Sequence, residues 1–277
     1  MRLGVAGWPV AHSRSPAIQN AALAACGLAE HWRYQLLPIP PELFGETVLA
    51  LPAQGFRGIN VTIPHKASAL ALAGQASDRA ASIGAANLLL FEPDGQIRAD
   101  NTDAPALTAA LAERISIAGA TALVLGAGGS ARAAVWALLE AGARQVRVWN
   151  RTPQRAQALA GELGAVAAAS AEPADVLVNC TAVGLEPDHD GLQGLPLGPD
   201  DLAGYRVVVD FVYRADGTPL LSAAQAAGIP TIDGLELLVA QGALSFEQFT
   251  GRPAPVDVMS QAARPEQSPP AGILSDR

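Results

Sequence analysis

Short apolar runs alternate with alanine-rich stretches of helical character along most of the chain. In the first hundred residues this pattern predicts strands at 3–6, 34–39 and 58–62, and helices near 16–27, near 41–51 and from residue 64 onward. Residues 87–91 and 96–99 are expected to pair as strands across Pro93-Asp94-Gly95, which is a turn sequence. Alternation of this kind is typical of α/β architecture.

A helix over 103–117 is expected to lead out of this block into a second α/β unit that starts at Thr121. The unit's predicted strands are 122–125, 145–149, 175–179 and 207–210, and its predicted helices are 130–141, 153–163 and 219–227. A final helix is predicted over 235–249, because Gly251 and Pro253 follow it. The proline-rich segment from Arg264 onward is expected to be a frayed tail.

Length and composition favour a globular protein of two domains. The chain has 277 residues, of which 50% are apolar and 16% charged, so it can bury two cores of ordinary size. Its net charge of −8 argues against a nucleic-acid partner and against an anionic membrane. A small anion could still bind in a local basic pocket.

The sequence gives no sign of a metal site, a disulfide framework or an export signal. Cys26 and Cys180 are far apart, and the four histidines (His12, His31, His65 and His189) form no pair at i,i+4 spacing. The first residues lack a basic region followed by an apolar run, and no stretch of about 18 apolar residues occurs. We therefore expect a cytoplasmic protein with no bound metal.

A glycine-rich loop carries the clearest motif. Gly126, Gly128 and Ala131 fit the pattern G-x-G-x-x-G/A directly after one predicted strand and at the start of a helix. Glycines permit the tight turn and let the backbone approach a pyrophosphate, while the helix N-terminus offers free N–H groups and a partial positive charge. The motif predicts dinucleotide binding, and the alternative is an incidental glycine turn.

The end of the next strand indicates which dinucleotide is preferred. An NAD site usually carries an acidic residue here, but this chain has Asn150, Arg151 and Thr152, with Arg155 close behind. Thr152 and Pro153 are expected at the N-cap and N1 positions, so Arg155 lies in the first helical turn, where the helix dipole disfavours a cation. A bound 2′-phosphate would reverse that penalty. We therefore favour NADP over NAD, the alternative being two solvated arginines.

Lys66 is the single lysine of the chain, beside 17 arginines. Arginine does not readily release a proton, whereas lysine can be tuned toward neutrality by burial or by nearby charge. One lysine kept among so many arginines is therefore a candidate for acid/base chemistry. The alternative is an accident of composition on a helix surface.

Several motifs in the same order resemble the shikimate dehydrogenase family over nearly the whole chain, from Gly4 to about Gly251. They are GWPVAHSRSP, NVTIPHK ending at Lys66, DNTD ending at Asp103, GAGGSAR, NRTPQRA, NCTAVG and DGLELLVAQGALSF. Together they are far more specific than any one alone. By this resemblance the protein is expected to transfer a hydride reversibly between NADPH and the ketone of 3-dehydroshikimate.

The resemblance also implies an arrangement of domains. Residues 1–103 are expected to form an open α/β substrate domain, 104–236 a Rossmann-type doubly wound NADP-binding domain, and 237–263 C-terminal helices that return to the first domain. Residues 264–277 are the expected flexible tail. The active cleft would lie between the two domains, where a hinge motion can exclude water.

Lys66 and Asp103 match the family's catalytic pair. A nearby acid must supply a proton as negative charge develops on the carbonyl oxygen, and a cation lowers the barrier electrostatically. A carboxylate beside an ammonium couples the two titrations, so either group could deliver the proton. The alternative for Asp103 is an N-cap of the helix that starts at Ala104-Pro105.

The remaining site residues are carried over by resemblance. Ser13, Ser15 and Tyr213 match positions that hold the substrate carboxylate, although Ser15 before Pro16 also suits a helix cap. Substrate hydroxyls are assigned to the positions Thr62, Lys66, Asn87, Asp103 and Gln241. The cofactor is assigned to Asp78, Gly126, Ala127, Gly128, Gly129, Ser130, Ala131, Asn150, Arg151, Thr152, Arg155, Thr181, Val183, Phe211 and Gly234.

Four positions depart from the family's usual pattern, namely Gln19, Ala86, Leu88 and Leu237. The lost threonine hydroxyl at Leu88 leaves open a related enzyme that acts on quinate or an aminoshikimate, with NADP or NAD. A metabolite-sensing module without catalysis is the third alternative, but it would not need Lys66. The sequence also leaves open whether the protein forms a homodimer.

Overall fold

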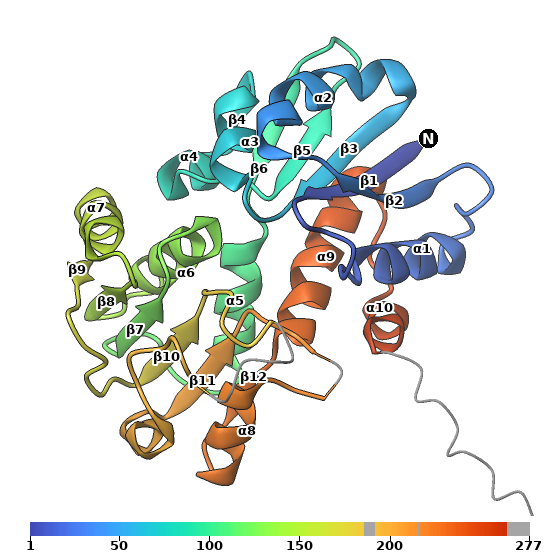
Figure 1. The fold of residues 1–277 in the computed structure, drawn as a ribbon. Coiled ribbons are helices and arrows are strands. Elements are labelled where there is room, and N and C mark those ends of the chain that lie inside the picture. The colour runs from blue at the N-terminus through green and yellow to red at the C-terminus, as the bar shows by residue number, and fades with distance from the viewer. Residues whose placement is uncertain (186–191, 215, 265–277) are drawn as a thin grey trace, which may run out of the picture.

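The protein is built from two α/β units that lie side by side, as Figure 1 shows for this computed structural model. The structure describes residues 1–185, 192–214 and 216–264. Each unit contains a six-stranded sheet with helices packed on it. The fold class predicted from the alternating pattern is therefore confirmed.

The first unit holds a mixed sheet with the strand order β2-β1-β3-β5-β6-β4. Its strands are β1 (Arg2–Gly7), β2 (Arg33–Pro38), β3 (Phe56–Val61), β4 (Gln75–Ala76), β5 (Leu88–Phe91) and β6 (Ile97–Asp100). Its helices are α1 (Ser15–Ala25), α2 (Phe44–Ala50), α3 (Lys66–Leu72) and α4 (Asp78–Ile83). β1 runs parallel to both of its neighbours, whereas β5 pairs antiparallel with β3 and with β6. The pair of β5 and β6 is the predicted hairpin.

The second unit holds a parallel sheet with the order β12-β11-β10-β7-β8-β9. Its strands are β7 (Thr121–Leu125), β8 (Gln145–Trp149), β9 (Val166–Ala167), β10 (Val176–Asn179), β11 (Val207–Asp210) and β12 (Thr231–Ile232). Its helices are α6 (Gly129–Glu140), α7 (Pro153–Leu163) and α8 (Pro219–Ala226). Counted from β7, the order is that of a Rossmann sheet, whose ligand crevice lies where the winding reverses, between β7 and β10.

The central strands of this sheet form where the sequence is continuously apolar. β10 and β11 read VLVN and VVVD and are buried along their whole length. Strands covered on both faces do not alternate between apolar and polar residues, which is the normal pattern of a buried parallel sheet. The polar residue that ends each run, Asn179 or Asp210, then lies at the carboxyl edge, where the crevice opens.

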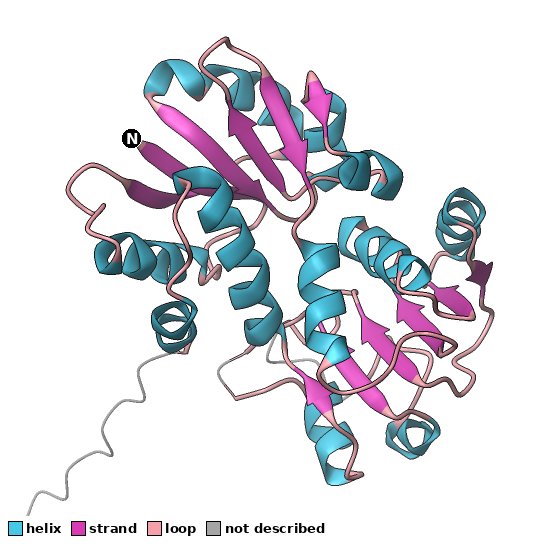
Figure 2. Ribbon diagram, turned by 180° about the vertical axis from the view of Figure 1, so that it is seen from behind, coloured by secondary structure: helices cyan, strands magenta, loops and turns pink. Residues whose placement is uncertain are grey.

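Two helices connect the units, as Figure 2 shows from behind. α5 (Asp103–Ala112) leaves β6 and packs on α6, while α9 (Gly234–Thr250) starts at the second unit and packs on α1 and β3 of the first. α10 (Val256–Ala263) then packs on α1 and α9. No helix among the described residues is long and apolar enough to cross a membrane.

The elements differ from the predictions mainly at their ends. The helix predicted over 103–117 stops at Ala112, because Ile115 and Ile117 lie in the following loop and are buried in the core there. The helix predicted over 41–51 is divided into a 3-10 turn, Pro41–Leu43, and α2. Helix α4 and the short strands β4, β9 and β12 were not predicted, whereas α10 falls within the C-terminal helices expected over 237–263. The predicted boundaries at residues 103 and 236 stay predictions, and residues 265–277 of the predicted tail lie outside the described residues.

Candidate active site

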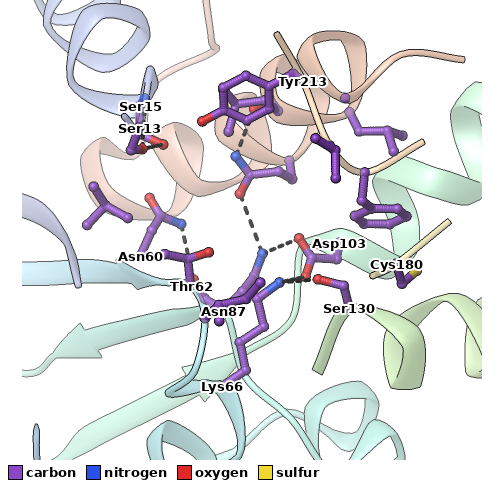
Figure 3. Close-up of a pocket in the computed structure, with 18 of the residues that line it drawn as sticks. Ser13, Ser15, Asn60, Thr62, Lys66, Asn87, Asp103, Ser130, Cys180 and Tyr213 are labelled. Carbon is purple, nitrogen blue, oxygen red and sulfur yellow. Dashed lines mark hydrogen bonds and ion pairs between the residues drawn. The ribbon is translucent and has the colours of Figure 1, made fainter. Parts of the chain in front are cut away.

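A pocket of about 170 Å³ lies between the two units and brings together residues from widely separated parts of the chain. All of the residues assigned to the substrate by resemblance line it, namely Ser13, Ser15, Thr62, Lys66, Asn87, Asp103, Tyr213 and Gln241. Figure 3 shows Lys66, Asp103 and Asn87 pointing toward one another on one side of the pocket, with Ser13 and Ser15 farther away. The structure therefore gathers these residues in one place.

Lys66 and Asp103 form a buried ion pair. Each is the first residue of its helix, α3 or α5, and Lys66 Nζ lies 2.5 Å from Asp103 Oδ2, with the two side chains 9% and 8% exposed. A lysine on a helix surface is thus ruled out. Burial of both charges weakens their screening by water, so the attraction between them is stronger than that of an exposed pair.

Asp103 does not cap its helix, so that alternative was wrong. Thr102 occupies the N-cap position of α5. Asn101 Oδ1 accepts hydrogen bonds from the backbone N–H groups of Asp103 (3.1 Å) and Ala104 (3.2 Å). Because Asn101 satisfies these backbone donors, the Asp103 carboxylate is left to face the pocket.

Asn87 holds the second oxygen of that carboxylate. Its Nδ2 donates to Asp103 Oδ1 at 2.8 Å, and its Oδ1 accepts a 2.7 Å hydrogen bond from the backbone N–H of Thr102. Asn87 and Thr102 are both buried. The carboxylate is therefore fixed from two sides, by an ammonium and by an amide whose own orientation is set by the backbone.

Ser13, Ser15 and Tyr213 place neutral hydroxyl groups at the other end of the pocket. Ser13 Oγ donates to Ser15 Oγ at 3.2 Å, and the backbone N–H of Arg14 donates to the Tyr213 hydroxyl at 3.3 Å. Burial raises the pKa of Tyr213, which keeps its phenol protonated and able to donate. Arg14, not Ser15, is the N-cap residue of α1, so the capping alternative for Ser15 was also wrong.

Sequence reasoning missed Asn60, which lines the same pocket. Its side chain is held by the Tyr34 hydroxyl at 2.8 Å and by the Ser245 hydroxyl at 2.8 Å. The signal was present, since Asn60 is a polar residue inside the apolar strand β3 and lies two positions before Thr62, on the same face. His12 and Cys180 also line the pocket without having been assigned.

The glycine loop after β7 fits a pyrophosphate. Gly126 has φ +107°, and a Cβ there would lie 3.0 Å from the carbonyl oxygen of Cys180. A Cβ on Gly128, the N-cap residue of α6, would meet nothing within 4 Å, so this face of the loop opens onto free space. The first turn of α6 contains no acidic residue. An anion can therefore approach the backbone N–H groups at the start of this helix.

The end of β8 fits a phosphate as well. Thr152 is the N-cap residue of α7 and Pro153 follows it, as predicted, although the threonine side chain makes no capping hydrogen bond. Arg151 and Arg155 are exposed, and the first turn of α7 contains no acidic residue. The Asn150 side chain donates to the Thr152 carbonyl at 3.0 Å and so shapes the turn between β8 and α7.

The remaining cofactor assignments are only partly gathered here. Ser130, Thr181, Phe211 and Gly234 line the pocket, and the Thr181 hydroxyl accepts from the backbone N–H of Val183 at 3.1 Å. Ala131 is buried in the core beneath the loop, and Ala127 packs against that core. Asp78 is exposed at the start of α4 and does not line the pocket, so the structure gives it no place in this site.

Three family models match successive parts of the chain. They describe the shikimate dehydrogenase substrate binding domain (residues 5–89), shikimate / quinate 5-dehydrogenase (109–183) and the shikimate 5'-dehydrogenase C-terminal domain (234–264). The matched segments contain Lys66, the glycine loop and α9. They therefore fall on both units and on α9, one of the two helices that connect them.

Whole-chain relatives point the same way. The shikimate dehydrogenase (NADP(+)) of Paracoccus denitrificans (strain Pd 1222) is 44% identical over 266 residues, 92% of each chain. A crystal structure of shikimate 5-dehydrogenase from Thermus thermophilus in complex with NADP(H) and shikimate superposes with a TM-score of 0.83 at 42% identity, covering 95% of this chain and 98% of that one. The ligand-free 5-ketofructose reductase of Gluconobacter sp. strain CHM43 gives 0.81 at 29% identity, covering 95% and 97%.

Proposed function

The chain belongs to the shikimate dehydrogenase family of NADP-dependent oxidoreductases, and we propose from this premise that it interconverts 3-dehydroshikimate and shikimate. The family resemblance drawn from the motifs is thereby confirmed. One observation carries the proposal for this chain, namely the buried 2.5 Å pair of Lys66 and Asp103 in a pocket that the dinucleotide loop also borders. This is the arrangement that proton transfer beside a hydride-bearing cofactor requires.

The residues that would hold NADP lie on the second unit. The backbone of 126–131 suits the pyrophosphate, and Arg151 and Arg155 suit the 2′-phosphate through charge-assisted hydrogen bonds. The chemistry that the nucleotide supplies when bound is donation of a hydride to the substrate carbon, or its acceptance in the reverse direction.

Lys66 and Asp103 manage the charge on the substrate oxygen. During reduction that oxygen gains negative charge, which the Lys66 ammonium stabilises before a proton from the pair completes the hydroxyl. In the oxidative direction the same pair removes the proton. Because both groups are almost fully buried, water screens their interaction only weakly.

Neutral donors recognise the rest of the substrate. We assign the carboxylate to the hydroxyls of Ser13, Ser15 and Tyr213, and the ring hydroxyls to Thr62, Asn87 and Gln241. Among the described residues that line the pocket, Lys66 is the only lysine or arginine. The strongest positive charge therefore lies at the reacting oxygen and not at the carboxylate, which favours charge that develops in the transition state.

The departures from the family pattern give no reason to expect a different substrate. Gln19, Ala86 and Leu88 are buried and do not line the pocket. The Gln19 amide donates to the Gly242 carbonyl at 2.8 Å, and Leu88 packs in the core around α1 and α9. These substitutions therefore leave the polar lining of the pocket unchanged. Leu237 does line it, but replaces one apolar side chain with another.

Absorbance at 340 nm tests the proposal, with shikimate or quinate as substrate and NADP⁺ or NAD⁺ as oxidant. We expect kcat/KM to be highest for shikimate with NADP⁺. A preference for quinate or for NAD⁺ would favour the related enzyme, and no turnover with any pair would favour the sensing module.

We also propose a cytoplasmic location, tested by cell fractionation, and a homodimer, tested by light scattering.

A further inference from the structure

The Lys66 ammonium contacts the dinucleotide loop as well as Asp103. Its Nζ donates a 2.9 Å hydrogen bond to the hydroxyl of Ser130, the second residue of α6, as Figure 3 shows. Lys66 and Asp103 begin α3 and α5 beside the first sheet, whereas Ser130 follows β7 of the second. The contact therefore connects the substrate side of the pocket to the loop that suits the pyrophosphate.

The stem of Lys66 also lies directly against this loop. A Cβ on Gly129 would lie 2.7 Å from Lys66 Cβ and 2.9 Å from its Cδ, closer than real side chains approach. The lysine is thus seated on the first turn of α6 over most of its length. A glycine at position 129 is required by this close approach, independently of any need of the nucleotide.

We propose that Ser130 is a positioning residue for Lys66, which aims the ammonium at the substrate oxygen and couples its orientation to the dinucleotide loop. The inference rests on the proposed function. An ammonium has three N–H donors, and Asp103 and Ser130 engage two of them among the described residues. With two directions fixed, tetrahedral geometry sets the third, which is left for the substrate.

The chemistry of the hydroxyl suits this role. Ser130 is neutral, so it holds an N–H without adding a second negative charge that would weaken the pull of the ammonium on the substrate oxygen. Its backbone lies in the first turn of α6, where a pyrophosphate would bind. An anion that shifts this turn therefore also shifts the acceptor of the lysine.

The single lysine allows a test without turnover. Protein labelled with ¹³C at lysine Cε gives one lysine side-chain signal, which reports on Lys66 alone. We expect Ser130→Ala to move this signal in the free protein, and Ser82→Ala, a matched change at an exposed serine of α4, to leave it in place. NADP⁺ should move the signal in the wild type, and by less than half as much in Ser130→Ala.

Kinetics separate positioning from cofactor binding. We expect Ser130→Ala to lower kcat by about tenfold to a hundredfold, the range for one hydrogen bond to a charged group, with the Kd of NADP⁺ by calorimetry within threefold of wild type. Ser130→Thr, which keeps the hydroxyl, should stay within threefold in both. Unchanged kcat together with an unmoved lysine signal would overturn the inference, as would a Kd that rises as much as kcat falls. If the wild type itself shows no turnover, the proposed function fails, and the lysine signal alone still decides whether Ser130 holds Lys66.

Discussion

The side-chain amide of Asn179 donates a 2.9 Å hydrogen bond to Oδ1 of Asp210, and both residues are completely buried at the carboxyl ends of β10 and β11. The same carboxylate accepts from the backbone N–H of Val212 at 3.0 Å and from the Thr218 hydroxyl at 2.7 Å. Asn179 Oδ1 in turn accepts from the Thr181 hydroxyl at 2.7 Å. The pair of Asn179 and Asp210 therefore fixes the loops that follow β10 and β11, which border the second unit's side of the pocket.

The buried carboxyl group of Asp210 predicts that the free energy of unfolding depends on pH. Burial raises the pKa of Asp210 from 3.8 to about 6, so between these values the native state binds more protons than the unfolded state. The stabilisation that proton binding at Asp210 gives to the native state is complete below pH 4 and is lost as the pH rises through 6. It amounts to something on the order of 3 kcal/mol. Asp210→Asn, which mimics the protonated acid, should therefore gain stability relative to wild type between pH 4 and pH 7.

Urea unfolding of both proteins across this range measures the difference. The comparison with Asp210→Asn is needed because hydrogen bonds lower the pKa of Asp100 and Asp175, which gives total stability the opposite trend with pH. Those groups are common to both proteins and cancel in the difference. Two stability curves that run parallel from pH 4 to pH 7 would contradict the assignment.

The pair of Lys66 and Asp103 predicts different outcomes for stability and for activity. Lys66→Met leaves a buried carboxylate without its cation, which should lower the free energy of unfolding by about 3–5 kcal/mol. Adding Asp103→Asn removes that charge and should restore much of the stability. The activity should fall by about 10²–10⁴ in either single variant and should not recover in the double variant, because proton transfer needs both groups.

Denaturant unfolding and the 340 nm assay, applied to the four proteins of this cycle, check both parts. Calorimetry with NADP⁺ serves as the control, since neither substitution should change nucleotide affinity by more than about threefold. A double variant no more stable than Lys66→Met would show that the two groups do not compensate each other.

The sequence predicted the parts of this site that depend on local pattern. The glycine loop follows a strand that is apolar after its first residue, and Thr152 with Pro153 starts a helix, so both could be placed from neighbouring residues alone. The contact of Lys66 with Ser130 joins residues 64 positions apart on different units. It depends on how the two units face each other, which no periodicity encodes, so the sequence could assign both residues without predicting that they touch.

Substitution by alanine should have different effects on activity at the adjacent glycines Gly128 and Gly129. A Cβ on Gly128 meets nothing and points into the space that would receive the pyrophosphate, so Gly128→Ala should weaken NADP⁺ binding by about tenfold or more at unchanged melting temperature. A Cβ on Gly129 meets the stem of Lys66, so Gly129→Ala should displace the lysine and lower kcat as well. Calorimetry, thermal unfolding and the 340 nm assay separate the two. Equal losses of kcat in both variants would argue against separate roles for Gly128 at the pyrophosphate and Gly129 at Lys66.

Arg155 should decide between the two nucleotides. It lies exposed in the first turn of α7, where a cation is unfavourable unless an anion binds there. Arg155→Ala should raise the KM for NADP⁺ by about tenfold, the loss of roughly 1.4 kcal/mol, and leave the KM for NAD⁺ within about twofold. Arg144→Ala, at another exposed arginine just before β8, is a matched control. Equal increases in both KM values would show that Arg155 does not recognise the 2′-phosphate.

Arg14 should affect the affinity for the substrate through its contacts with α10. Its guanidinium donates to the carbonyls of Ala263 (3.2 Å), Ala262 (3.1 Å) and Arg264 (3.1 Å) at the end of α10, where a cation and the helix dipole attract each other. Its backbone lies between Ser13 and Ser15. Arg14→Ala should therefore loosen these serines and raise the KM for shikimate by about threefold to tenfold, roughly 1 kcal/mol, with little change in kcat.

Arg252→Ala provides the matched control, because Arg252 also donates to a backbone carbonyl, that of Cys26 at 2.7 Å, but does not adjoin the serines. Steady-state kinetics with shikimate varied at saturating NADP⁺ measures the effect, and thermal unfolding of both variants measures the general cost of losing an arginine clamp. If the KM rises equally in both variants, or if Arg14→Ala lowers only the melting temperature, the clamp stabilises the fold without positioning Ser13 and Ser15. A rise in KM confined to Arg14→Ala instead connects α10 to the recognition of the substrate carboxylate.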